Sequence, residues 1–208
     1  MIGAMLATQR IAILLILGCY LPAQVPPQKQ ERQTLERRGF DQAQAPAVTF
    51  VLPGTWSYLK PSTRSRLLEW ECGKPEPATG FLLWLGKEGA GTVEANLSHW
   101  GAQLEGKDPK PSKLAVGQGF QATLLDKSGT YVAEVSPGSP HRHSKPNYRL
   151  LACVLETPSG PLYMRLVGPE KVIEAERPAA LAWLKSFEPK VATPKPADTP
   201  GKKPPNKR

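Results

Sequence analysis

The chain has 208 residues, of which 40% are hydrophobic and 22% are charged, and this is enough for one packed domain with additional segments. Its net charge of +9 is concentrated at the C-terminal end, because residues 190–208 carry six basic residues and one acidic residue, whereas residues 47–189 carry 16 and 14. The folded part is therefore nearly neutral, which argues against nucleic acid as a partner.

Residues 1–19 have the pattern of an export signal, in which Arg10 precedes a short apolar run. That run is shorter than the roughly 20 apolar residues that cross a bilayer. The segment ends like a bacterial lipobox, which predicts lipid attachment at Cys19 and anchoring to a membrane. Simple secretion after cleavage behind Ala23 and an uncleaved anchor are the alternatives. We expect the protein in the periplasm or at the cell surface.

Two segments have compositions that cannot bury a core. Residues 20–46 are rich in Gln, Pro and charge, and residues 190–208 are rich in Pro and Lys. We therefore predict a disordered tether and a disordered basic tail, with a transient helix over residues 30–38 as the alternative for the tether. Residues 47–189 carry the periodic pattern of a single folded domain.

The first half of this domain predicts short strands. Residues 48–52 form a strand, and the following Trp56 is expected to pack as an aromatic anchor. Residues 67–72 alternate apolar and acidic side chains, and residues 81–85 are wholly apolar. We predict that these two strands pair as a hairpin with a long loop.

Glu69 and Glu71 share one face of the predicted strand, about 7 Å apart. This spacing is compatible with a carboxylate pair for glycoside hydrolysis. It is equally typical of any solvent-exposed strand face, and we favour that interpretation.

A glycine-rich loop over residues 86–91 precedes a predicted helix. The loop lacks the spacing of a Walker phosphate-binding motif, so we interpret it as a flexible connection. Thr92 is the expected N-cap of the helix. The apolar stripe that should face the sheet consists of Val93, Leu97, Trp100 and Leu104.

Asn96, Trp100 and Gln103 occupy neighbouring positions on this helix, at i, i+4 and i+7. Trp100 is expected in the core. Asn96 and Gln103 either order a loop or line a groove, and we favour the structural role.

The second half of the domain predicts two hairpins and a helix. Residues 120–125 and 130–135 read as strands joined by a polar turn at residues 126–129. Residues 148–155 are apolar on both faces, which is typical of a strand covered on both sides, and a tight turn at residues 157–160 leads to its partner strand.

A proline interrupts the last helical segment. Because proline is tolerated at a helix start but not inside a helix, Pro178 predicts a short turn over residues 169–175 followed by a main helix over residues 177–185.

Cys72 and Cys153 form an even pair if Cys19 carries lipid, and an oxidising compartment permits a disulfide between them. The alternative is that both are small buried hydrophobic residues, because each lies on an apolar strand face.

His141 and His143 are the candidate metal ligands, since two imidazoles at i, i+2 can point together from a loop. A third ligand is required, and His99 lies far away in the sequence, so a hydrated basic loop is the alternative. The sequence contains no nucleophile-elbow or zinc-protease motif. We therefore predict no catalytic residue and no cofactor.

Several short motifs of the sequence, taken together, resemble a family of uncharacterised exported bacterial proteins. Their pattern is an aromatic-x-x-Pro-Gly-x-Trp start, an Asn-x-x-x-Trp-x-x-Gln helix, a Gly-Thr-Tyr strand and a Gly-Pro entry to the last helix. The matching residues are Phe50, Pro53, Gly54, Trp56, Asn96, Trp100, Gln103, Gly129, Thr130, Tyr131, Gly168 and Pro169.

Over residues 48–187 the order of elements is also similar, more distantly, to the PsbP-like superfamily. This resemblance implies an α+β fold in which an antiparallel β-sheet is flanked by helices on both faces, an α/β/α sandwich. It carries over no catalytic residues.

These observations predict a lipid-anchored, non-catalytic envelope protein that binds or helps to assemble a protein partner. The alternatives are a metal-dependent or other hydrolase of the envelope, and a structural protein that holds an anionic wall polymer through its basic tail.

Overall fold

The computed structural model describes residues 32–34 and 48–190. The predicted signal segment with Cys19, the rest of the predicted tether and residues 191–208 lie outside the described residues. Within the described part, no helix is long and apolar enough to cross a membrane.

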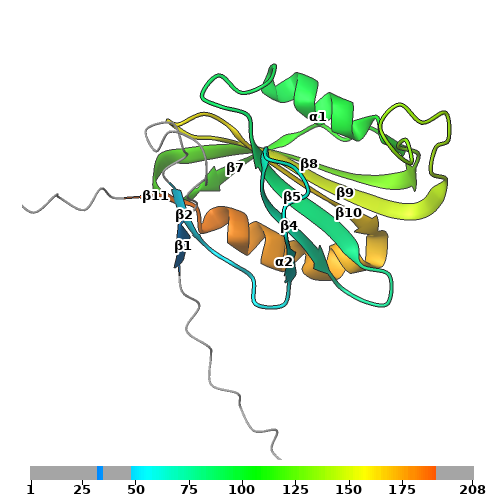
Figure 1. Ribbon diagram of the computed structural model, residues 1–208, viewed down its shortest axis with the longest axis horizontal. Coiled ribbons are helices and arrows are strands. Elements are labelled where there is room, and N and C mark those ends of the chain that lie inside the picture. Colours follow the sequence, from blue (N-terminus) through cyan, green and yellow to red (C-terminus); the bar gives the residue numbers. More distant parts are fainter. Residues whose placement is uncertain (1–31, 35–47, 191–208) are drawn as a thin grey trace, which may run out of the picture.

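The described residues form two antiparallel sheets and two α-helices, so the predicted α+β class is confirmed (Figure 1). The eight strands of the large sheet run in the order β3 (Ser57–Leu59), β4 (Arg66–Cys72), β5 (Ala78–Trp84), β10 (Leu162–Pro169), β9 (Lys145–Glu156), β8 (Phe120–Tyr131) and β6 (Leu104–Glu105), with β7 (Ser112–Val116) also paired to β8. The small sheet contains β1 (Arg32–Thr34), β2 (Val48–Val51) and β11 (Glu188–Pro189). The helices are α1 (Val93–Gly101) and α2 (Glu170–Lys185), with a 3₁₀ turn η1 (Gly117–Gly119).

Strand β9 lies inside the large sheet, between β8 and β10, and its residues 150–155 are all buried. The even-numbered residues of this stretch belong to a hydrophobic cluster with Leu97 of α1. The odd-numbered residues belong to a second cluster with Trp183 of α2. In Figure 1, α1 and α2 lie on opposite sides of the sheet. The predicted burial of this strand on both faces is therefore confirmed.

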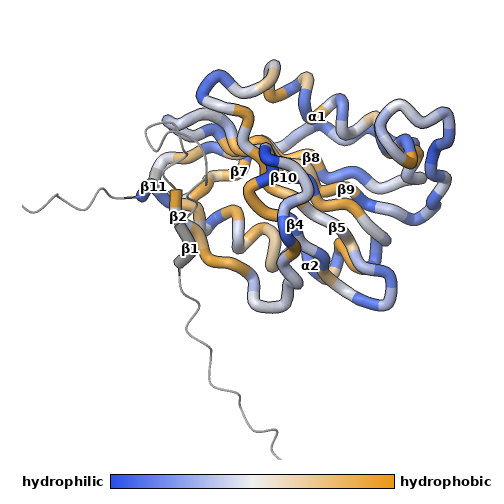
Figure 2. Tube along the Cα trace, in the orientation of Figure 1, coloured by the Kyte–Doolittle hydropathy of each residue, from blue (hydrophilic) through white to orange (hydrophobic). Residues whose placement is uncertain are grey.

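Figure 2 shows that hydrophobic residues gather along the central strands, whereas the loop between β8 and β9 is mainly hydrophilic. Two of the three predicted hairpins form. β4 pairs with β5, and β9 pairs with β10 through a turn in which the amide of Gly160 donates to the carbonyl oxygen of Thr157 at 3.0 Å. At this glycine φ is +103°, a conformation that side chains with a Cβ atom rarely adopt.

An aromatic cluster fills the space between α2 and the sheet, and Trp56 is its predicted anchor. Trp56 is buried and stacks on Trp70, with 4.9 Å between ring centroids. Its Nε1 donates to Glu176 Oε2 at 3.0 Å, which ties the loop after β2 to α2. Phe50 and Trp183 complete the contact at 5.8 Å between centroids. The anchor role of Trp56 is therefore confirmed.

The polar turn predicted at residues 126–129 does not exist. β8 runs as one strand from Phe120 to Tyr131 and pairs with β9 along nearly its whole length. The polar side chains that suggested a turn have tertiary partners instead: Lys127 Nζ donates to the carbonyl oxygen of Gly101 at 3.0 Å, and Asp126 binds two arginines.

The break predicted at Pro178 is also absent, because α2 is one helix of 16 residues that contains this proline. Pro178 removes one backbone donor, so the carbonyl oxygen of Glu174 loses its helical partner. Both residues lie on the exposed side of α2, where water can bind that carbonyl group. The buried residues on the other side, including Ile173 and Leu184, hold the helix on the sheet.

Helix α1 begins as predicted, with Ala95 N donating to Thr92 Oγ1 at 3.1 Å. It ends at Gly101, so the last residue of the predicted apolar stripe, Leu104, belongs to β6 instead, where it is still buried. The predicted tether also differs in part, because Arg32–Thr34 pairs with β2. The free backbone edge of β2 offers hydrogen bonds that composition alone does not reveal.

Cys72 and Cys153 are free and buried, which agrees with the interpretation of both as small buried hydrophobic residues and not with the possible disulfide. β5 and β10 lie between the strands that carry them. Three strand spacings of about 4.8 Å separate the two residues by at least about 14 Å, which is beyond the reach of a disulfide. Burial raises the pKa of both thiols to about 12.

Asp126 joins β8, β9 and α2 through three hydrogen bonds: two from Arg149, at 2.6 and 2.9 Å, and one from Arg177 at 2.9 Å. Burial alone would raise the pKa of Asp126, but the two arginines hold it below its ordinary value. A lowered folded-state pKa adds stability that is present above the unfolded-state pKa, near 3.9, and is lost as the pH falls through the folded value.

We therefore expect Asp126→Asn to lower the free energy of unfolding at pH 7 by roughly 1.5–3 kcal/mol. In urea titrations the difference between wild type and variant should shrink as the pH falls below the unfolded-state pKa, near 3.9. Glu88→Gln, at an exposed carboxylate, should stay within about 0.5 kcal/mol at pH 7. A wild-type advantage that does not shrink at any pH below about 3.9 would contradict this account.

Candidate functional site

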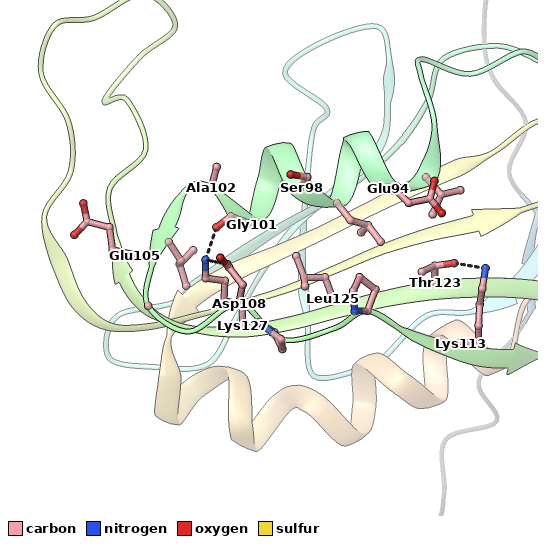
Figure 3. A pocket seen from close by; sticks show the side chains of 16 residues that line it. Glu94, Ser98, Gly101, Ala102, Glu105, Asp108, Lys113, Thr123, Leu125 and Lys127 are labelled. Carbon is pink, nitrogen blue, oxygen red and sulfur yellow. Dashed lines mark hydrogen bonds and ion pairs between the residues drawn. The ribbon is translucent and has the colours of Figure 1, made fainter.

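A groove lies between α1 and strand β8, and Figure 3 shows it from close by. Its volume is about 880 Å³. One wall is α1, the floor is β8, and residues 106–111 with the start of β7 form the opposite wall. The apolar side chains that line it are Val93, Leu97, Leu104, Pro109, Pro111 and Leu125.

The groove exists because two short strands share the outer edge of β8. β7 pairs with residues 120–124, and β6 pairs with residues 130 and 131. The stretch of β8 between them has no outer neighbour among the described strands, so the chain crosses it as a loop over residues 106–111. Leu125 and Lys127 lie on this stretch of β8 and line the groove, because no strand lies beside them at the outer edge.

Two lysines lie at opposite ends of the groove. Lys127 has only 4% of its side chain exposed; it donates to the carbonyl oxygen of Gly101 and forms an ion pair with Asp108, whose side chain is 85% exposed. Lys113 is exposed and donates to Thr123 Oγ1 at 2.9 Å. The groove thus combines an apolar floor with a few placed polar groups, the composition typical of a ligand site.

A second cavity, the arginine pocket, lies beyond the C-terminal end of α1. Its volume is about 620 Å³. Its walls combine guanidinium groups with aromatic rings, and they include Arg66, Arg142, Arg165, Phe81, Trp100 and Tyr131. The pocket thus joins β4, β5 and β10 to the loop between β8 and β9.

Arg165 is a largely buried cation in this pocket, on β10 between the core residues Tyr163 and Val167. Its Nη2 donates to Gln103 Oε1 at 2.7 Å and to the hydroxyl of Tyr131 at 3.1 Å, and both partners are neutral. Burial lowers the pKa of Arg165 from its ordinary value.

The three residues that the sequence places on one helix divide between two roles, and Gln103 lies beyond the end of α1. Asn96 Nδ2 donates to the carbonyl oxygens of Ala90 and Thr92, so Asn96 orders the loop before α1. Trp100 belongs to the core and lines the arginine pocket together with Gln103. Loop ordering therefore applies to Asn96, whereas Trp100 and Gln103 line a cavity, the arginine pocket.

The loop that carries His141 and His143 lines the arginine pocket through Arg142 and not through the two imidazole rings. The ring of His143 stacks on Tyr131, with 5.2 Å between centroids, and Arg142 between the two histidines lines the pocket. Among residues 32–34 and 48–190, no three His, Cys, Asp or Glu side chains form a group that could hold a metal ion. Metal binding by His141 and His143 therefore stays a prediction.

One carboxylate of the candidate pair on β4, Glu69, has a structural role. Glu69 is buried, contrary to the exposed strand face that we expected, and its Oε1 accepts from Ser62 and from Arg66 at 2.7 Å each. Burial alone would raise the pKa of Glu69, but these hydrogen bonds lower it. Its bonds to Ser62 close the loop between β3 and β4 onto the sheet.

The glycine-rich loop before α1 is fixed by two contacts to the sheet and the helix. The amide of Ala90 donates to the hydroxyl of Tyr163 at 3.0 Å, and Asn96 binds the Ala90 carbonyl oxygen. The loop is therefore a connection that positions α1 over the groove.

Sequence reasoning missed the two cations that define these cavities, Lys127 and Arg165. Lys127 was assigned to a turn. Arg165 stands alone in an apolar strand, and a single charged residue at such a position was the signal that could have identified it.

No family model matches the sequence, and no curated protein matches it. Among solved structures, the chain is similar to the solution structure of cyanobacterial PsbP (CyanoP) from Synechocystis sp. PCC 6803. The identity is 11%, the TM-score is 0.46, and the match covers 76% of this chain and 91% of that chain. At this identity and TM-score, the likeness carries no argument about ligand, partner or activity.

Proposed function

We propose that the protein is a non-catalytic binding module of a bacterial cell envelope and that its binding surface is the groove between α1 and β8. The proposal includes export, lipid attachment at Cys19 and a location in the periplasm or at the cell surface. It also includes the PsbP-like α/β/α arrangement, which is supported by the two hydrophobic clusters on alternate sides of β9.

The observation that carries the proposal is the apolar groove of about 880 Å³ on the α1 side. Binding sites are concave, mainly apolar and equipped with few convergent polar groups, and their volumes lie between roughly 300 and 1,000 Å³. Leu97, Leu104 and Leu125 supply the apolar surface, and Lys113 supplies an exposed cation at the rim. We infer that an apolar side chain of an envelope protein partner enters this groove.

The groove can be tested with the purified chain and the uncharged dye N-phenyl-1-naphthylamine, whose fluorescence rises in apolar surroundings. Ser98 is exposed on α1 and is one of the residues that line the groove. Ser98→Trp should fill the groove and weaken dye binding at least about tenfold, since excluding one apolar ring costs a ligand about 1.5–3 kcal/mol.

Ala95→Trp is the matched control, because Ala95 is exposed on the same helix but does not line the groove. This variant should bind the dye like the wild type. In envelope extracts, one defined partner should be captured by the wild type and by Ala95→Trp, and lost with Ser98→Trp. Equal capture by all three proteins, or capture that depends only on residues 190–208, would contradict the proposal.

A further inference from the structure

Arg165 differs from the other partly buried cations described above in its electrostatic partners. Arg149 and Arg177 bind Asp126, and Lys127 binds Asp108. Within the described part of the chain, Arg165 has no carboxylate at ion-pair distance; its hydrogen-bond acceptors are an amide and a phenol. A buried cation without a counter-charge is unfavourable, so such an arrangement calls for a second, functional explanation.

The hydrogen-bonding capacity of this guanidinium is largely unused. Nε is fully buried and has no partner. Nη1 makes no hydrogen bond to the described residues either, but unlike Nε it is not fully buried. Arg165 therefore retains a free donor that is reachable from the pocket.

The charges around Arg165 are predominantly positive. Arg66 and Arg142 line the same pocket, together with His99 and one carboxylate, Glu134. Arg66 is already paired with Glu69 at 2.7 Å, and Glu134 accepts from the amide of Gly138 at 2.9 Å. A negatively charged ligand would supply the counter-charge that the pocket lacks.

Aromatic rings form the other half of the wall. The guanidinium carbon of Arg66 lies 4.5 Å from the ring centroid of Phe81, and that of Arg165 lies 5.9 Å from the same centroid. Trp100 packs edge-on against Phe81, at 6.2 Å between centroids. These rings give the pocket an apolar aromatic lining next to the cationic one.

We propose that the arginine pocket binds an aromatic oxyanion, a ligand that carries a carboxylate or phosphate group on a flat ring. The oxyanion accepts a charge-assisted hydrogen bond from Nη1 of Arg165, the donor that has no partner and is reachable from the pocket. The ring packs on Trp100 and Phe81. Arg142, on the hydrophilic loop between β8 and β9, adds a cation at the rim.

The proposal is tested by isothermal titration calorimetry on the full chain, at constant ionic strength held with chloride. The probes are phenyl phosphate and benzoate, with inorganic phosphate as the reference without a ring. We expect one site per chain for at least one aromatic probe, and weaker binding of inorganic phosphate. A preference between the two aromatic probes identifies the oxyanion.

Arg165→Met should weaken binding of the aromatic probe about tenfold to a hundredfold, the range for a lost hydrogen bond to a charged group. Arg165→Lys keeps the charge but loses the planar guanidinium, in which Nη2 binds Gln103 and Tyr131 while Nη1 remains for the ligand. It should fold like the wild type and still bind at least about fivefold more weakly. Arg149→Met, on the neighbouring strand and already paired with Asp126, is the matched control and should bind like the wild type.

Absence of binding by both aromatic probes, or equal affinity of wild type, Arg165→Met and Arg165→Lys, would overturn the proposal. Equal affinity for phenyl phosphate and inorganic phosphate would overturn the role of the rings. The dye experiment on the groove uses different residues and an uncharged probe, so the two sites fail or succeed independently.

Discussion

Trp183→Ala should lower the free energy of unfolding by about 3–5 kcal/mol, the range for truncating a large aromatic residue in a packed core. Trp183 is 2% exposed, and its ring lies 5.2 Å from that of Trp70, 5.5 Å from that of Trp56 and 5.1 Å from that of Phe187, between centroids. Its removal opens a cavity between α2 and the sheet that rigid neighbouring rings cannot fill.

A second substitution tests whether this loss of stability comes from lost packing or from a lost hydrogen bond. Trp183 Nε1 is buried without a hydrogen-bond partner, so the indole contributes packing and no hydrogen bond. Trp183→Phe keeps part of the ring and removes an unsatisfied donor, and it should cost clearly less than Trp183→Ala. Urea unfolding followed by circular dichroism measures both. Equal losses in the two variants would show that packing does not determine the effect.

The central strand and its covers were predictable because their pattern is dense and local. Residues 150–155 are apolar at every position, and a strand with two apolar faces requires contacts on both. Thr92 identified the start of α1 because capping depends on residues three positions apart. Both signals lie within one short segment, so the rest of the fold was not needed to interpret them.

Other features depend on partners that are distant in the sequence. Pro178 stays inside α2 because packing of the buried side outweighs one lost backbone hydrogen bond. β1 forms because β2 has a free edge. The spacing of Cys72 and Cys153 is set by the strand order, which the sequence does not state.

The two cavities were only partly predictable for the same reason. Trp100 and Gln103 were recognised from their spacing in the sequence, but the position of Arg165 in the pocket arises from the register of β10 with β5, which places Arg165 opposite Phe81. The groove arises from the gap between β6 and β7 along β8. Neither register nor gap leaves a pattern within one segment.

Gly129→Val is the substitution that tests the revised course of β8, and it should destabilise the protein by about 3 kcal/mol. A Cβ atom at position 129 would lie 1.8 Å from the carbonyl oxygen of Glu105, so β6 has to move away. Because the contact is with backbone, the cost should lie at the upper end of the range for overpacking. In the turn that the sequence suggests, no such clash would exist.

Displacement of β6 has a local signature in amide hydrogen exchange. The amide of Val132 donates to the carbonyl oxygen of Gln103 at 2.8 Å, and this bond should open in Gly129→Val. Ser128→Val is the matched control: its side chain is exposed, its hydroxyl bonds only Glu170, and valine suits a strand, so stability should change by less than about 1 kcal/mol. If Ser128→Val proved the more harmful of the two, residues 126–129 would form a turn and the floor of the groove would be wrongly placed.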